Sequence, residues 1–497
     1  MWFCGFYVRP DTIRAVSRPP VPASASRPQS DLRTIVTYAV TVFVGQIAVM
    51  GFGVVDTIVT GRYSELALAV LAVSAAVFVT VYVSMMGLIQ ALLPIWAELH
   101  GAGRPADIGR SARQALYVCA ATSVLGMAVL FNPGPLLRWT EVPTEFQPMV
   151  RQYLSVVGWS LPAALLFRVF STLSQALGAP RLVTGLQIVA LGVKLPLSIW
   201  LTFGGAGVPA LGVVGCAWAT FVVNHLLCLL GLALLRAQPL YAPLALWQRL
   251  ERPHLPTLRA FARLGVPAAL SLLVEVTSFT LMALFIARLG VTAAAAHQIA
   301  ANVAALLYMV PLSLGVAASA RVGYWRGAGD EARARGVALH SFGAAALLGL
   351  ALAAATFIAR PWIAAVYARH SGVALLAARL LAWVALYHLA DSAQTVAVFL
   401  LRCYRVTLTP LLVYSVLLWG LGLAGGYVLA YHGLGPLAAQ RSPAAFWQAA
   451  AVALLLAATA MGLMLRWASR RALLKSEQCS QAIRAFSPSP ASGRGQG

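Results

Sequence analysis

Long apolar stretches alternate with short polar and basic segments along most of this chain. Twelve stretches are continuous and long enough to cross a lipid bilayer, which takes roughly 20 residues in helical form. Their length and continuity favour helices over β-barrel strands, which are about ten residues long and alternate in polarity. We predict spanning helices at about 34–60, 65–97, 112–132, 149–176, 182–204, 212–235, 260–288, 292–322, 334–358, 373–401, 408–431 and 445–467.

The composition agrees with this pattern and excludes other classes of protein. Of the 497 residues, 60% are hydrophobic and 10% are charged, and the mean hydropathy is +0.80. A soluble, disordered or collagen-like chain does not have this balance. The six cysteines are scattered, which indicates neither a zinc site nor a disulfide framework. The G-x-x-x-x-G-K-[ST] motif does not occur, so we expect neither ATP nor another cofactor to supply the energy.

The net charge of +22 is concentrated in the loops and the two tails. Tails and even-numbered connections together hold roughly 26 Lys and Arg residues, against about seven in the odd-numbered connections. Basic residues in that arrangement indicate the cytoplasmic side of a membrane, so both termini are expected in the cytoplasm. We therefore expect the lipid bilayer, and not a nucleic acid, to be the partner of these charges.

The chain divides into two similar halves around a basic, proline-rich linker. A GAGR turn at Gly101–Arg104 follows the second apolar stretch, and a GAGD turn at Gly327–Asp330 follows the eighth. Six spans in each half give both copies the same orientation, with a pseudo-twofold axis along the membrane normal. The predicted fold is an all-α integral membrane protein of twelve transmembrane helices in two pseudo-symmetric six-helix lobes. The segments are a disordered cytoplasmic tail (1–33), an N-lobe (34–236), a cytoplasmic linker (237–258), a C-lobe (259–468) and a second disordered cytoplasmic tail (469–497).

Three acidic residues lie well inside the apolar stretches: Asp56, Glu275 and Asp391. An ionised carboxylate near the bilayer centre costs about 2.5–3.5 kcal/mol even on the lenient insertion scales. Such a group persists when it faces an internal cavity, pairs with a cation or takes up a proton. We expect the three acids to face one aqueous cavity between the lobes and to bind a cation or a proton, although any one of them could instead only hold helices together.

Basic residues also occur inside the spans. Lys194 lies about 15 Å along the helix from the nearer end of its span, beyond the reach of a lysine side chain. Asp56 is the one carboxylate well inside the spans of that half, so we predict a Lys194–Asp56 ion pair. Arg168 is expected to extend to the membrane surface, and Arg379 has no assigned role.

Polar side chains accompany the carboxylates of the second half. Tyr387 and Asp391 are four residues apart, as are Gln298 and Asn302, so each pair lies on one helix face. Each polar group could simply form a hydrogen bond between helices, worth about 0.6–2 kcal/mol. Glu275, Tyr387 and Asp391 also offer oxygen ligands that suit a proton or a hard monovalent cation such as sodium.

Between about residue 34 and residue 468 the chain resembles the multidrug and toxic compound extrusion (MATE) family, in its bacterial NorM-type branch. The motifs that carry the resemblance are VDTIVTG (Val55–Gly61), GVVGCAWAT (Gly212–Thr220), RLGVP (Arg263–Pro267), VEVTSF (Val274–Phe279), AHQIAAN (Ala296–Asn302), MVPLSLG (Met309–Gly315), RVG (Arg321–Gly323) and DSAQTV (Asp391–Val396).

The resemblance implies an antiporter of the bacterial inner membrane, acting as a monomer. It would export bulky cationic drugs or toxins in exchange for sodium ions or protons while access alternates between the two sides. By the same resemblance, Glu275, Asp391 and Tyr387 match a second-lobe cation site, in which Glu275 and Asp391 would hold a sodium ion. Asp56 matches an acidic residue of the first lobe, and Gln298 and Asn302 match polar residues of the cavity.

The chain departs from the family at two positions of the fifth span. Relatives usually carry asparagine where this chain has Lys194 and Ser198, and these positions cluster with the first-lobe aspartate. The departure agrees with the ion pair predicted above. It also questions proton uptake by Asp56, because an ammonium group nearby favours the ionised carboxylate.

Three other functions are weighed against the antiporter. A lipid-linked oligosaccharide flippase of the same superfamily would place basic residues such as Lys194, Arg168 and Arg379 in its cavity to hold pyrophosphate. An enzyme is not expected, because His297 and His388 form no H-E-x-x-H or comparable motif. A passive channel is disfavoured, because paired lobes around buried carboxylates suit alternating access.

Overall fold

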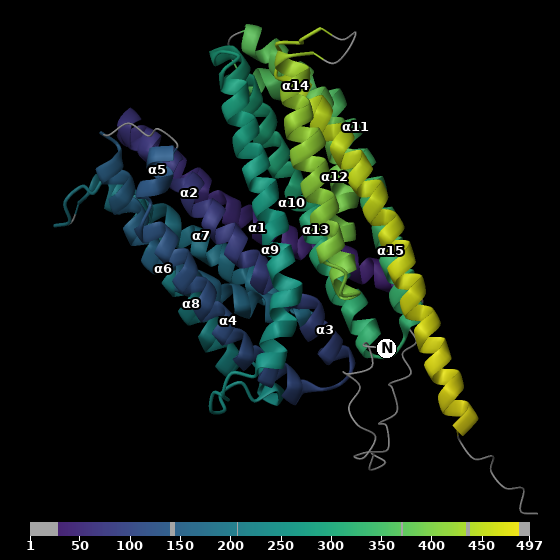
Figure 1. Cartoon of the computed structure of the whole chain (residues 1–497). Coiled ribbons are helices and arrows are strands. Elements are labelled where there is room, and N and C mark those ends of the chain that lie inside the picture. Colours follow the sequence, from purple (N-terminus) through teal and green to yellow (C-terminus); the bar gives the residue numbers. More distant parts are fainter. Residues whose placement is uncertain (1–27, 140–144, 206, 369–370, 434–437, 487–497) are drawn as a thin grey trace, which may run out of the picture.

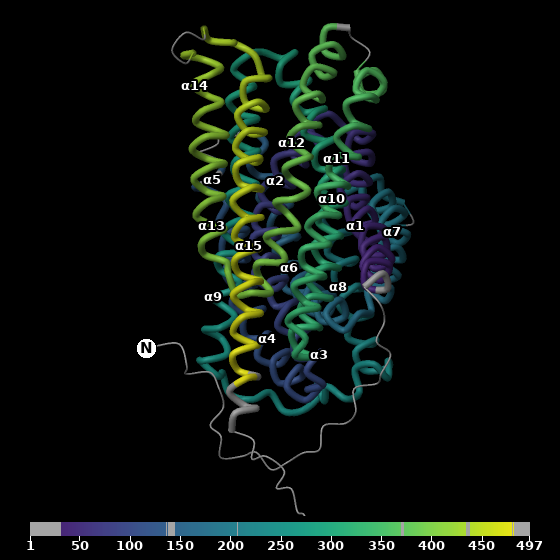
Figure 2. Tube along the Cα trace, turned by 90° about the vertical axis from the view of Figure 1, so that its right-hand side faces the viewer, coloured from purple at the N-terminus to yellow at the C-terminus, as the bar shows by residue number. Residues whose placement is uncertain are grey.

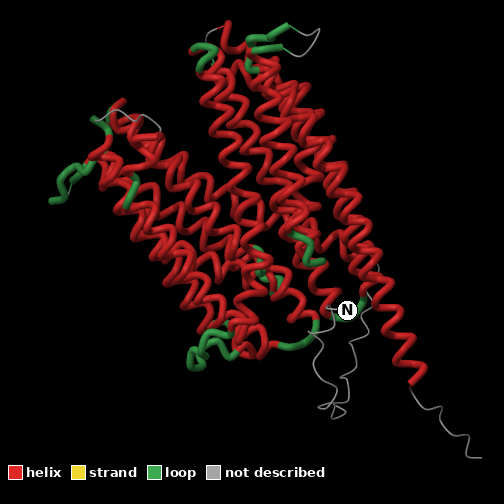
Figure 3. Tube along the Cα trace, in the orientation of Figure 1, coloured by secondary structure: helices red, strands yellow, loops and turns green. Residues whose placement is uncertain are grey.

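The structure is a computed structural model, and it describes residues 28–139, 145–205, 207–368, 371–433 and 438–486. Helices dominate the described residues, as Figure 3 shows, and the one β-bridge there joins Gly205 to Val208. Twelve helical segments are long and apolar enough to span a membrane, which confirms the predicted all-α membrane fold. Their bounds are α1 (Pro28–Tyr63), α2 (Glu65–Gln90) with α3 (Leu93–Gly101), α4 (Pro105–Phe131), α6 (Gln147–Ala176), α7 (Pro180–Phe203), α8 (Val213–Ala237), α9 (Leu255–Ala287), α10 (Val291–Gly327), α11 (Glu331–Tyr367), α12 (Ser371–Cys403), α13 (Leu408–Ser415) with η3 (Val416–Ala424) and α14 (Gly425–Tyr431), and α15 (Ala444–Phe486).

Two of the spans are not single regular helices. The second span is interrupted by a turn at Ala91 and Leu92, between α2 and α3, where Pro94 stands at the start of α3 and has no backbone N–H to donate. The eleventh span has a π-helical middle section, η3, between α13 and α14. Such wide turns displace neighbouring side chains around the helix axis, so the apolar pattern does not predict which side chains face inward there.

The helices form two bundles, one from α1–α8 and one from α9–α15. They lie close together at the end near α3 and diverge toward the end near the short helix α5 (Gly134–Trp139) and α14 (Figure 1). Each bundle has its own hydrophobic cluster, centred in the first on residues such as Trp96 and Leu154 and in the second on residues such as Trp447 and Leu381. Figure 2 shows α1 beside α10 and α11 of the second bundle. Accordingly, Ile35 of α1 belongs to the second cluster.

The two glycine turns noted in the sequence meet where the bundles cross. A Cβ atom on Gly101 would overlap the backbone carbonyl oxygen of Tyr324, and a Cβ atom on Gly327 would overlap that of Glu98. Glycine is therefore required at both positions for α3 and α10 to approach this closely. The contact is reciprocal, as a pseudo-twofold axis between the halves demands.

The structure differs from the sequence prediction at the two ends of the helical region. The first helix begins at Pro28 and not at 34, and Asp31 in its first turn accepts hydrogen bonds from Arg321 (2.8 Å) and Arg333 (2.9 Å) of the second bundle. The last helix continues through Phe486, so the disordered tail predicted from 469 is helical over its first part. Hydropathy marks where lipid ends, whereas the helix continues because Ala, Arg, Leu, Lys and Gln favour it. The remaining tail residues, 1–27 and 487–497, lie outside the described residues.

The segment between the bundles is held against the first one. It contains a short helix, η2 (Pro239–Leu244), and then a stretch in which Glu251 pairs with Arg113 of α4 at 2.7 Å. Tyr117 of α4 donates a hydrogen bond to the backbone oxygen of Glu251, and Gln114 donates one to that of Arg252. The connection between the bundles is thus fixed to α4 by side chains of that helix.

Candidate functional site

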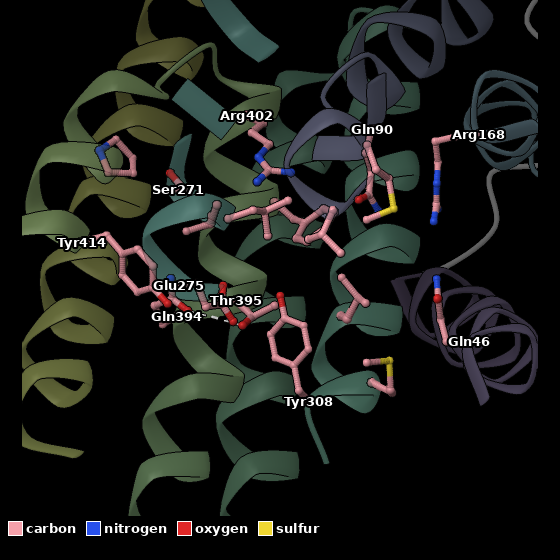
Figure 4. Close-up of a pocket in the computed structure, with 18 of the residues that line it drawn as sticks. Gln46, Gln90, Arg168, Ser271, Glu275, Tyr308, Gln394, Thr395, Arg402 and Tyr414 are labelled. Carbon is pink, nitrogen blue, oxygen red and sulfur yellow. Dashed lines mark hydrogen bonds between the residues drawn. The ribbon is translucent and has the colours of Figure 1, made fainter. Parts of the chain in front are cut away.

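A cavity of about 200 Å³ lies between the two bundles. It is lined from the first bundle by α1, α2 and α6 and from the second by α9, α10, α12, α13 and α15. Figure 4 shows Gln46, Gln90 and Arg168 on one side and Glu275, Tyr308 and Tyr414 on the other. Apolar side chains make up most of the remaining wall, including Val49, Tyr82, Met86, Leu272, Met309, Leu312, Phe399 and Met461.

Glu275 is the one carboxylate among the side chains that line this cavity. It lies mid-way along α9, and Figure 4 shows it beside Gln394 and Thr395 of α12, with Tyr414 pointing toward it. Tyr414 and Arg402 are its principal polar neighbours. This placement confirms that Glu275 faces a cavity and not the acyl chains, and it gives the carboxylate access to a ligand held between the bundles.

Asp391 lies deeper in the second bundle than predicted. Its side chain is 2% exposed and is not among those that line the cavity, so the expectation of one cavity shared by all three acids is wrong. Thr395, one helical turn later on α12, does line the cavity and lies between Asp391 and the space. The carboxylate lies 3.5 Å from Nδ1 of His388, and Glu275 is close enough to interact with it electrostatically.

Tyr387 packs in an aromatic cluster next to Asp391. Its ring centroid is 6.0 Å from that of Phe279 and 5.6 Å from that of Trp447, in edge-to-face geometry. The three rings line a second, small cavity of about 20 Å³. Edge-to-face packing of this kind fixes ring orientation, so Tyr387 is held in place beside the carboxylates.

Gln298 and Asn302 are exposed on α10 and do not line the cavity. The Gln298 side chain donates a hydrogen bond to Asn302 at 3.1 Å, as the four-residue spacing predicts. His297, the residue before Gln298, is buried with its ring 5.8 Å from that of Trp447. The predicted polar pair therefore exists but lies apart from Glu275 in this conformation.

The first bundle contains a second charged centre, separate from the cavity. Nζ of Lys194 lies 2.8 Å from Oδ1 of Asp56 and 2.9 Å from Oδ2, which confirms the predicted ion pair. Lys194 also donates to Oγ1 of Thr220 at 2.6 Å, and Ser198 donates to Asp56 at 3.2 Å. Lys194 is fully buried and Asp56 is 7% exposed, so neither residue is a solvated helix-end group.

Two arginines that line the cavity were not predicted to do so. Arg168 is 7% exposed and faces the cavity from α6, so its predicted extension to the membrane surface is wrong. Arg402 is 4% exposed and lies in the last turn of α12, one residue beyond the span predicted from hydropathy. Arg379, on the same helix, is exposed. The signal available in the sequence for Arg168 was its position inside an apolar span, eight residues before the end of α6 at Ala176.

The family model MatE matches the chain twice, over residues 42–200 and 267–428. The two matches start about as far apart as the two glycine turns at Gly101 and Gly327, which supports the relation between the halves. The chain is 36% identical to a probable multidrug resistance protein NorM of Aromatoleum aromaticum, covering 87% of this chain and 94% of the relative. It is 32% identical to the multidrug resistance protein MdtK of Edwardsiella ictaluri, covering 89% and 96%.

Solved structures share the fold at low sequence identity. The eukaryotic MATE transporter AtDTX14 aligns with a TM-score of 0.79 at 17% identity, covering 90% of this chain and 99% of that one. The Vibrio cholerae MATE transporter VcmN in its bent form aligns with a TM-score of 0.78 at 19% identity over the same shares. These likenesses concern the arrangement of the helices in two bundles.

Proposed function

The chain belongs to the MatE family, in its NorM-type branch, and on that premise we propose that it exports bulky organic cations across the bacterial inner membrane in exchange for sodium ions or protons. Members of this family are membrane transporters and not enzymes, and the chain is a multidrug efflux transporter by its relatives. The comparisons do not support the alternative of a lipid-linked oligosaccharide flippase. The observation that carries the finer proposal is the single carboxylate, Glu275, in a largely apolar cavity between two bundles.

A cation in this cavity meets one carboxylate, that of Glu275, and two positive charges, those of Arg168 and Arg402, in a wall that is otherwise largely apolar. Charges attract more strongly there than in water, so Glu275 would supply the main electrostatic attraction for a cationic drug. Tyr308, Tyr414 and Tyr82 add aromatic faces that attract cations at close range. A sodium ion or a proton on Glu275 removes the same attraction. This competition would couple the export of the drug to the entry of the ion.

Asp391 would serve as the inner position for the coupling ion. It lies next to His388 and behind Thr395, where a proton or a small cation fits more readily than a drug does. Tyr387, fixed by its aromatic neighbours, would add a hydroxyl ligand for sodium. Gln298 and Asn302 would contact substrate only when the bundles move relative to each other, since α10 lies at their junction.

The two bundles would rock about their crossing at Gly101 and Gly327 to exchange access. We assign the lobes to 34–236 and 259–468, joined by the linker at 237–258. Both termini would then be cytoplasmic, which agrees with the excess of basic residues in the tails and even-numbered loops. One chain contains both bundles and the whole cavity, so a monomer suffices for transport.

The test is ethidium efflux from proteoliposomes under separately imposed sodium and proton gradients. We expect one of the two gradients to drive efflux by the wild-type protein, and Glu275→Gln to reduce that efflux at least tenfold. Glu65→Gln, which removes an exposed carboxylate at the start of α2, is the matched control and should leave efflux unchanged. Efflux that ignores both gradients would refute the antiport mechanism.

A further inference from the structure

The ammonium group of Lys194 is surrounded by oxygen atoms deep in the first bundle. Both carboxylate oxygens of Asp56 lie within 2.9 Å of Nζ, Oγ1 of Thr220 is at 2.6 Å, and the backbone oxygen of Cys216 is at 3.3 Å. A lysine ammonium has three N–H donors, so these four oxygens use all of them. Oxygen ligands of this kind, with one carboxylate among them, are also what a hard monovalent cation prefers.

Three separate helices build this oxygen cluster. Asp56 comes from α1, Lys194 and Ser198 from α7, and Thr220 and Cys216 from α8. Ser198 donates its own hydrogen bond to Oδ1 of Asp56, so the carboxylate is held from a second side. The cluster would remain if Lys194 were shortened, because none of its oxygen atoms belongs to the lysine.

The ion pair of Lys194 and Asp56 has no net charge and is enclosed by the helices of the first bundle. Lys194 is fully buried, and neither it nor Asp56 lines either of the two cavities described above. The other titratable side chains that face Asp56 are Tyr153 of α6 and Cys216 of α8, which carry no charge at neutral pH. No net charge is left at this place to attract an ion from outside.

We propose that the Lys194 ammonium fills a cation site of the first lobe from within the chain, so that this lobe binds no external sodium ion or proton. A purely structural ion pair predicts that removal of the lysine leaves a buried carboxylate that takes up a proton, because burial disfavours its charged form, and that binds no sodium ion. A filled cation site predicts instead that removal of the lysine opens a place that one sodium ion occupies at a pH where the carboxylate is ionised. Ion counting separates the two, independently of transport.

The first experiment compares the wild-type protein with Asp56→Asn/Lys194→Met in detergent, by equilibrium binding of radioactive sodium and by proton uptake between pH 8 and pH 6. The double variant has no unbalanced charge in the cluster, so it is expected to fold. The proposal expects equal numbers of bound sodium ions and protons in the two proteins. One ion or proton fewer in the double variant would show that Asp56 binds external cations in the wild type and would overturn the proposal.

The second experiment counts the same ions on Lys194→Asn, with elution volume on gel filtration as the check of folding. We expect one additional sodium ion per molecule relative to the wild type at pH 8. Asp56→Asn/Lys194→Asn is the matched control and should return to the wild-type number. A folded Lys194→Asn protein that gains no sodium ion would overturn the proposal. If that variant fails to fold, Lys194→Gln takes its place, and a lower ion count in the double variant of the first experiment still overturns the proposal.

The proposal stands apart from the assignment of Glu275. Loss of sodium or proton binding in Glu275→Gln tests the cavity of the second lobe. It does not change the number of ions that Lys194→Asn is expected to gain over the wild type. Conversely, an extra ion in Lys194→Asn says nothing about which gradient drives efflux. Failure of one account is therefore distinguishable from failure of the other.

Discussion

The two lobes bury their carboxylates in opposite ways. In the first lobe, Asp56 lies 2.8 Å from the ammonium of Lys194 and is enclosed by three helices. In the second lobe, Glu275 faces a cavity of about 200 Å³, and Asp391 has an imidazole, His388, at 3.5 Å. In the first lobe a lysine of the chain pairs directly with the carboxylate, whereas in the second lobe Glu275 faces a cavity that a ligand can enter, with Arg402 in the same wall.

This difference shows that a duplicated scaffold does not impose duplicated chemistry. The halves share their helix order and a reciprocal glycine contact between Gly101 and Gly327, which the crossing of the bundles requires. Asp56, Glu275 and Asp391 are free of that constraint, because none of them takes part in the contact between Gly101 and Gly327. The charge of Asp56, which is paired with Lys194, is expected to contribute to stability. The charge of Glu275, which faces the cavity, is expected to contribute to ligand binding.

The largest expected effect is on stability, from Lys194→Met in the first lobe. In sodium-free buffer at pH 8, removing one partner of a buried ion pair leaves an uncompensated charge, which costs about 3–5 kcal/mol of unfolding free energy. Asp56→Asn/Lys194→Met should recover most of that loss, because no charge remains unpaired. Unfolding titrations in mixed micelles measure both variants; equal stability of Lys194→Met and the wild type would contradict the paired state of Asp56.

The second effect is on transport, and we expect it from substitutions in the second lobe and not from those in the first. We expect Asp391→Asn, like Glu275→Gln, to lower gradient-driven ethidium efflux at least tenfold while changing unfolding free energy by less than about 1 kcal/mol. Asp56→Asn/Lys194→Met should retain efflux within about twofold, since its charges cancel in the wild type. Rates of dye efflux from proteoliposomes provide the comparison, and loss of efflux in the double variant would place the first lobe in the coupling.

A smaller effect is expected at Thr220, which accepts a hydrogen bond from Lys194 at 2.6 Å. Thr220→Val keeps the shape of the side chain and removes the acceptor, so the unfolding free energy should fall by about 1 kcal/mol. Thr220→Ser keeps the hydroxyl and serves as the control, with less than half of that loss. Efflux should be unchanged in both, and a stability loss equal in the two variants would assign the effect to packing.

The smallest effect concerns the positive charge of Arg402 in the cavity wall of the second lobe. Arg402→Gln should strengthen equilibrium binding of ethidium by roughly threefold, which corresponds to about 0.6 kcal/mol of removed repulsion. Arg379→Gln, an exposed position of the same helix, should not change it. Weaker binding in Arg402→Gln would mean that this arginine orients Glu275 and does not oppose the cation.

The spans could be predicted because a membrane helix is specified locally, by the apolar character of its own residues. The prediction of 408–431 agrees with the span as the structure has it, Leu408–Tyr431. Helix ends beyond the lipid, such as the first turn of α1 at Pro28 and the extension of α15 to Phe486, were not predicted, because hydropathy does not report helix propensity. Asp31, which joins the lobes through Arg321 and Arg333, was missed for that reason.

The candidate site was predicted in part. The Lys194–Asp56 pair followed from charge balance alone, because a buried ammonium needs a partner and one half offered a single carboxylate in its spans. The common cavity for all three acids did not follow, because the direction of a side chain depends on how each helix is rotated against its neighbours. Asp391 and Glu275 lie on different helices, and only the packing of α9 against α10, α13 and η3 and of α12 against α10, α11 and α15 places one at the cavity and the other away from it.

The central claim is that drug and coupling ion compete for Glu275 in the cavity between the lobes. Equilibrium binding of ethidium to the purified protein, titrated with sodium ions at pH 8 and repeated without sodium at pH 6, tests it most directly. For the wild type, we predict that sodium or protons displace the dye, and that Glu275→Gln binds the residual dye with no response to either ion. Displacement of the same size in Glu275→Gln and in the wild type would contradict the claim.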